Sequence, residues 1–142
     1  MKRQQGSQTV EFTLIAFPFV LLLLAVFELT RFLWLNMVFD SAVNHAMRLA
    51  RSMEPSYSAD QSVEAKLASF PLIDIENLTL SSPRYAKTIS DLANYRSSSA
   101  SEAKLAQYIV TYDFSFLLIP KLSAMWKESM TLQRIMVVAY DN

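Results

Sequence analysis

The most prominent pattern in the chain is an apolar run near its amino end. Sixteen residues from Phe12 to Phe27 carry no charge, and Glu11 and Glu28 flank them. A bilayer core requires about 20 apolar residues, and the uncharged neighbours on both sides extend the run to that length. The pattern predicts a membrane-spanning helix within residues 7–30.

Beyond this run, hydrophobic residues recur at steps of three and four, the spacing of one helix face. These positions are Phe32, Leu35, Phe39, Ala42, Ala46, Leu49 and Met53. Polar residues form the opposing face: Asn36, Asp40, Asn44, Arg48 and Arg51. We therefore expect a continuous helix from about Val10 to Met53, roughly 65 Å long at 1.5 Å per residue. Pro55 ends it, because a residue before proline is disfavoured in helical geometry.

The remaining chain predicts a short helix and three strands. The helix runs from Ala59 to Phe70, and the strands cover Asn77–Ser81, Gln107–Phe116 and Met130–Tyr140. The second strand places five apolar side chains on one face: Tyr108, Val110, Tyr112, Phe114 and Phe116. This face needs a cover, and the stalk helix offers one. The predicted fold class is α+β, with a long amino-terminal helix packed against a small antiparallel sheet.

The stretch from Arg84 to Lys104 has no predicted element. Its serine-rich part, Ser97 to Ser101, lies in a polar context without periodicity, and we interpret it as a solvated loop.

Charges near the apolar run predict its orientation. Lys2 and Arg3 precede it, and the positive-inside tendency then places the amino terminus in the cytoplasm and the rest in the periplasm. Four interpretations compete: a cleaved secretory signal, an uncleaved signal anchor, a buried helix of a soluble protein, and a prepilin-type leader. A secretory signal requires small residues after its apolar core, and Ala25 to Leu29 provides no such site.

A prepilin-type cut would precede the apolar run and leave the helix in the membrane. Gly6, the only glycine, is followed by Ser7, and Glu11 comes five residues after Gly6. A carboxylate carried into lipid costs a few kcal/mol, so Glu11 needs a partner. The new ammonium at Ser7 of a neighbouring subunit would be one. Alternatively, Gly6 is incidental in a flexible tail and Glu11 only reaches the headgroups.

Four residues in or just beyond the run have structural interpretations. Glu28 and Arg31 are spaced for an ion pair that marks where a helix leaves the membrane. Pro18 removes a backbone donor inside the span, so a local kink is expected. Trp34 falls just past the span, where an aromatic belt would lie.

Composition argues against several function classes. Thirteen basic residues balance thirteen acidic ones, so nothing favours binding of nucleic acid. The chain has no cysteine, one histidine (His45) and no glycine besides Gly6, which leaves no thiolate metal site and no glycine-rich phosphate loop. We expect no catalytic residue, no cofactor and no metal.

These motifs resemble the TadE/TadF-like pseudopilin family of the tight-adherence (Flp) pilus system. The resemblance rests on Gly6-Ser7, Glu11-Phe12, a proline-interrupted leucine run, and FELTRFLW from Phe27 to Trp34. The carboxyl half is more loosely similar, through the segments YIVTYDFSF, LLIP and VVAYDN. The resemblance implies that Gly6 ends a leader, that Ser7 begins the mature chain, and that Glu11 is its fifth residue.

Two departures indicate a minor pseudopilin rather than a major pilin. Phe12 replaces the tyrosine that major Flp pilins carry beside the glutamate, and the chain is far longer than those pilins. The implied organisation is a leader (1–6), a membrane segment (7–30) and a periplasmic pilin-like domain (31–142) that includes the helix continuation 31–53.

The resemblance also implies the partners and the location. The expected partners are a prepilin peptidase, other pilins or pseudopilins, a pilus assembly platform in the inner membrane, and the lipid bilayer. The expected location is the bacterial inner membrane, or the pilus itself. The alternative is an uncleaved, signal-anchored periplasmic protein that binds partners in an envelope secretion or adhesion machine.

Overall fold

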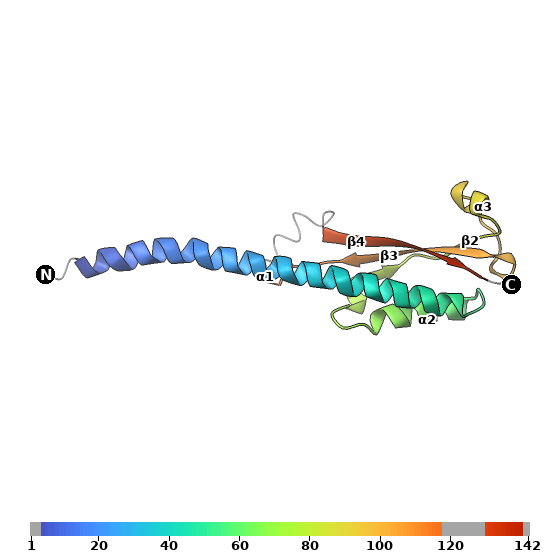
Figure 1. The fold of residues 1–142 in the computed structure, drawn as a ribbon, viewed down its shortest axis with the longest axis horizontal. Helices are drawn as coiled ribbons and strands as arrows, with labels where there is room; N and C mark the ends of the chain where they lie inside the picture. The colour runs from blue at the N-terminus through green and yellow to red at the C-terminus, as the bar shows by residue number, and fades with distance from the viewer. Residues whose placement is uncertain (1–3, 118–129, 141–142) are drawn as a thin grey trace.

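A computed structural model describes residues 4–117 and 130–140 of the chain. One long helix, α1 (Gln4–Arg51), extends far beyond a small domain that packs along its carboxyl half (Figure 1). The other elements, in chain order, are α2 (Tyr57–Ala68), η1 (Ile75–Asn77), β1 (Leu78–Leu80), β2 (Arg84–Ala86), α3 (Ile89–Ala93), η2 (Ala100–Glu102), β3 (Leu105–Asp113) and β4 (Thr131–Ala139).

The sheet is antiparallel and is organised around β3. Strand β4 pairs with the whole of β3, from Leu105 opposite Ala139 to Asp113 opposite Thr131. Strands β1 and β2 share the other edge of β3, since Leu78 lies opposite Tyr112 and Arg84 opposite Gln107. The α+β arrangement of a long helix and a small antiparallel sheet is therefore confirmed.

Helix α1 covers one face of the sheet. Phe39 is fully buried and lies 6.1 Å from the ring of Tyr112, while Phe32 meets Phe114 edge-on at 5.2 Å. Burying one such side chain contributes about 1.5–3 kcal/mol. Three buried alanines of α1 at four-residue spacing, Ala42, Ala46 and Ala50, form part of the core beside α2. The aromatic face of β3 thus has the cover that its alternation requires.

The helix pattern is confirmed with local corrections. Helix α1 begins at Gln4, before the expected Val10, and ends at Arg51, so 48 residues span roughly 72 Å. It continues through Pro18, and Figure 1 shows its axis changing direction within the blue part. Ala50 is buried where Leu49 was expected, and Leu49 is half-buried.

The shorter elements shift by a few residues. Helix α2 starts where Ser56 caps Ala59 N–H through its hydroxyl, and it ends at Ala68, two residues before the expected Phe70. Strand β3 spans 105–113 rather than 107–116, because β4 and β2 extend its pairing at the amino end. The expected strands at 77–81 and 130–140 are confirmed as β1 and β4.

The stretch 84–104 has more structure than its sequence predicted. It contains β2, α3 and η2, and the serine-rich segment ends in η2 while the backbone N–H of Ser98 bonds to the carbonyl of Tyr85. The expectations for Lys2, Arg3 and most of the LLIP segment fall outside the described residues.

Candidate membrane and assembly surface

The amino half of α1 is an apolar helix without a protein cover. Most of its large hydrophobic side chains from Val10 to Val26 are at least 45% exposed, Leu14 reaches 74%, and Leu24 is half-buried. Soluble proteins rarely leave a continuous apolar surface of this kind in water. In length and composition the helix can span a membrane, and none of its most apolar part is buried within the described chain. This surface indicates membrane anchoring.

The residues of the predicted processing and assembly site lie along the first turns of α1. Gly6 and Ser7 fall in its first turn, and Glu11 and Phe12 follow one turn later with exposed side chains. None of the ion pairs found in the described part of the chain involves Glu11. The four residues therefore follow one another along one helix, and the Glu11 side chain is exposed.

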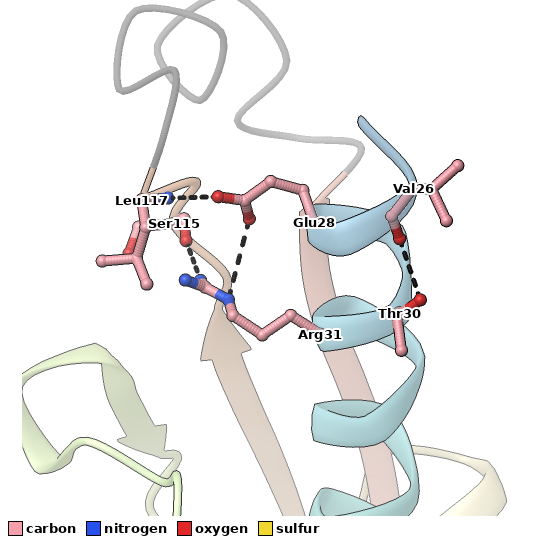
Figure 2. A network of polar contacts seen from close by, with 6 residues as sticks. All are labelled: Val26, Glu28, Thr30, Arg31, Ser115 and Leu117. Atoms are coloured by element: carbon pink, nitrogen blue, oxygen red, sulfur yellow. Dashed lines mark hydrogen bonds and ion pairs between the residues drawn. The ribbon is translucent and has the colours of Figure 1, made fainter. Parts of the chain in front are cut away.

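The ion pair of Glu28 and Arg31 is confirmed, and it does more than the sequence indicated. Arg31 Nε lies 3.7 Å from Glu28 Oε2, and the Glu28 side chain is 5% exposed. Figure 2 shows both side chains reaching the chain that follows β3: Glu28 Oε1 accepts the backbone N–H of Leu117 at 3.0 Å, and Arg31 donates to the carbonyl of Ser115. We call these four residues the clamp.

Aromatic rings surround the clamp. The Arg31 guanidinium lies over the Phe114 ring, 4.6 Å from its centroid, and Phe114 also meets Phe116 edge-on at 5.4 Å. A desolvated cation over an aromatic face adds to the attraction of the ion pair. The carboxyl end of the β3 segment is thus fastened to α1 at the point where the apolar run ends.

A second contact fixes β4 to α1, and it corrects the expected polar face of the helix. Arg134 Nε donates to Asp40 Oδ1 at 2.7 Å and Arg134 Nη2 to Asn36 Oδ1 at 2.8 Å. Asn36 and Asp40 therefore face the sheet edge instead of opposing it, because a cation on β4 satisfies them. No local feature of the sequence predicts this pairing, since the partners lie 94 and 98 residues apart.

Three tyrosine hydroxyls gather around Asp60 at the base of α2. Tyr108 donates to Asp60 Oδ1 at 2.8 Å, Tyr85 donates to the same carboxylate at 3.3 Å, and Tyr140 lies 3.3 Å from the Tyr108 hydroxyl. Burial, followed by the Asp60 charge, raises the pKa of Tyr85 to about 12. Burial also raises the pKa of Tyr108 and of Tyr140. This network joins α2 to β2, to β3 and to the residue that follows β4.

The described residues show no group of metal-ligating side chains. His45 is exposed and its ring stacks at 5.4 Å on Phe70, which gives it a packing role. The candidate functional surfaces of the described residues are the exposed amino half of α1 and the junction of α1 with the domain.

Comparison with known proteins found one family. The family model described as "TadE-like protein" matches residues 6–48, which spans the processing and assembly residues, the apolar run and the part of α1 that packs on the sheet. Searches of curated proteins and of solved structures gave no match. The resemblance inferred from the motifs is confirmed for this segment.

Proposed function

Since residues 6–48 are a TadE-like segment and that family works in the tight-adherence pilus system, we propose that the chain is a minor pseudopilin of such a pilus. It is a non-enzymatic subunit held in the inner membrane by α1. Its partners are other pilins or pseudopilins and the assembly platform.

One observation supports this proposal above the others. A single unbroken helix has an amino half with exposed apolar side chains and a carboxyl half that forms the domain core. The same exposed helix surface can rest in lipid and later pack against the helices of neighbouring subunits. A soluble protein has no use for such a surface, and a cleaved secretory protein would lose it.

Processing is the first step of the proposed mechanism. A prepilin peptidase cuts between Gly6 and Ser7, in the first turn of α1. Glycine within a helix costs about 1 kcal/mol relative to alanine, so this turn opens readily to a protease. Loss of residues 1–6 removes Lys2 and Arg3, and the net charge changes from zero to 11 minus 13, or −2.

Registration by Glu11 is the second step. The cut creates an ammonium at Ser7, and the Glu11 carboxylate of a neighbouring subunit pairs with it in lipid. Phe12, exposed beside it, supplies apolar contact. The attraction between two opposite charges is large where water is scarce, so one such pair selects one stagger between adjacent helices.

Mass spectrometry tests the processing step. Chain purified from cells with an active prepilin peptidase should begin at Ser7, and a Gly6→Ala variant should keep Met1. The matched control Gln5→Ala should be cut normally, since it changes a neighbouring residue of the leader. An intact Met1 end in the original chain would instead support the uncleaved envelope interaction protein.

Pilus counts test the registration step. Glu11→Gln removes the charge and keeps the size. An unpaired partner charge in lipid costs a few kcal/mol. Since 1.4 kcal/mol corresponds to a tenfold change in an equilibrium constant, the number of pili per cell should fall by about tenfold or more. Glu11→Asp, the control that keeps the charge, should retain more of them. Normal counts for Glu11→Gln, with normal processing, would refute registration.

A further inference from the structure

Exposed apolar side chains surround α1 at the end of the domain nearest the apolar run. We call this set the collar, and its members are Leu33, Trp34, Met37, Leu72 and Leu117. Each is more than half exposed, and Met37 reaches 74%. Three come from α1 itself, while Leu72 and Leu117 come from loops that precede β1 and follow β3.

The five side chains lie beside one stretch of α1, from Glu28 to Met37. Leu33, Trp34 and Met37 line a shallow groove on the helix face that also carries Thr30 and Ser41. Figure 2 shows Thr30 pointing away from the clamp, so this face looks away from the strand end. On the other side, Leu72 and Leu117 line a cavity of about 220 Å³ together with Arg31 and Leu35.

Part of the backbone beside the collar has its polar groups bonded within the protein. Non-helical backbone near the hydrocarbon must satisfy its polar groups in this way. Glu28 accepts from the Leu117 N–H and Arg31 donates to the Ser115 carbonyl, and the Thr30 hydroxyl donates to the carbonyl of Val26 at 2.8 Å. Glu28 is therefore turned inward and buried, and Arg31, whose side chain is 25% exposed, pairs with it.

The length of α1 that a bilayer takes up indicates where the collar lies relative to the membrane. A hydrocarbon core of about 30 Å takes about 20 helical residues, so a span that begins at Phe12 reaches Arg31. The headgroup layer adds about 5–7 Å on each side, or about three to five helical residues, which carries the membrane to about Leu35. Leu33 and Trp34 fall within this layer and Met37 lies at its outer edge, and together they continue the exposed apolar surface of the span.

We propose that the headgroup layer of the outer leaflet covers the collar, so that the domain sits partly within the membrane surface and not above it. The lipid bilayer is the occupant of this surface. The proposal rests on the membrane anchoring contained in the proposed function, and it adds the depth at which the domain is seated.

The absence of cysteine makes a direct test possible, since each single-cysteine variant reports one position. Leu33→Cys and Met37→Cys probe the collar, and Leu22→Cys probes the hydrocarbon. Asn44→Cys is the matched control, because Asn44 is exposed and lies two helical turns after Met37 on nearly the same face. The full-length variants are placed in phospholipid vesicles and treated with N-ethylmaleimide.

A thiol in apolar surroundings keeps its proton and reacts slowly. We expect the two collar cysteines to react at least about tenfold more slowly than Asn44→Cys, which corresponds to about one unit of thiol pKa. The protection should persist when the protein is diluted in excess lipid. Collar cysteines that react as fast as Asn44→Cys, with Leu22→Cys still protected, would overturn the seating and leave the anchoring intact.

Two other outcomes also decide against the proposal. Protection that disappears on dilution in lipid would show that a second copy of the chain, not the bilayer, covers the collar. Rapid reaction of Leu22→Cys would show that α1 does not enter the bilayer, and this result would remove the proposed function together with the seating.

Discussion

Tyr108 shows how a single hydroxyl can join distant elements. Its side chain is fully buried, and its hydroxyl donates to Asp60 on α2 while it meets Tyr140 beyond β4. A buried hydroxyl requires such partners, because an unsatisfied one costs about 1–3 kcal/mol. Asp60 lies in the first turn of α2. The tyrosine network adds a specific role for its carboxylate.

The network predicts alkaline sensitivity of the domain. The tyrosine pKa is 10.0 in the unfolded chain and about 12 for Tyr85 in the fold, and Tyr108 shifts in the same direction. Above pH 10 the unfolded state releases protons that the folded state holds, so the free energy of unfolding should fall as the pH rises toward 12. Unfolding of the full-length chain in detergent, followed against pH, checks this.

Tyr108→Phe separates the network from general alkaline effects. The variant keeps the ring and loses the hydroxyl, so it should be about 1–2 kcal/mol less stable at neutral pH and less sensitive above pH 10. Tyr95→Phe is the control, because Tyr95 is 78% exposed. Equal stability and equal pH profiles of the two variants would contradict the role of the network.

At the scale of elements, the clamp holds the end of the β3 segment against α1. Glu28→Ala should leave the Leu117 N–H without its acceptor and Arg31 without its ion pair, at a cost of about 1–3 kcal/mol. Glu28→Gln keeps an oxygen for the Leu117 N–H and should cost less. Amide hydrogen exchange of a peptide covering residues 113–117 measures the effect.

The exposed Glu64 of α2 provides the control for charge. Glu64→Ala removes a carboxylate at a distance from the clamp, so exchange at residues 113–117 should stay as in the original chain. If Glu28→Ala leaves the exchange as slow as Glu64→Ala does, the clamp does not stabilise this segment.

Elements with a strong periodic pattern could be predicted, and short elements held by pairing could not. The three- and four-residue steps after Phe32 predicted α1, and the alternation around Tyr112 predicted β3. Strand β2 has only three residues, and it exists because β3 offers an open edge beside β1. No local pattern in 84–86 carries that information.

The same distinction applies to the candidate site. Gly6, Ser7, Glu11 and Phe12 form one short motif, so sequence alone could single them out. The clamp joins Arg31 to Ser115 across 84 residues, and only the folded chain brings them together. The sequence spacing of Glu28 and Arg31 revealed their ion pair but not the backbone that they hold.

At the scale of the whole molecule, the two halves of one helix suit two different environments. The amino half of α1 suits lipid, and the carboxyl half is packed under a sheet. Figure 1 shows the domain gathered along the second half only. The family match ends at residue 48, near the end of α1, so the TadE-like segment is essentially this helix, and the sheet is built onto it.

Because α1 has no break between its two halves, the helix and the sheet should move together along the helix axis. Any axial displacement of the helix moves the sheet by the same amount, about 15 Å for every ten residues drawn out of the bilayer. An axial load applied at the amino-terminal end of α1 would then be transmitted along the helix to the domain.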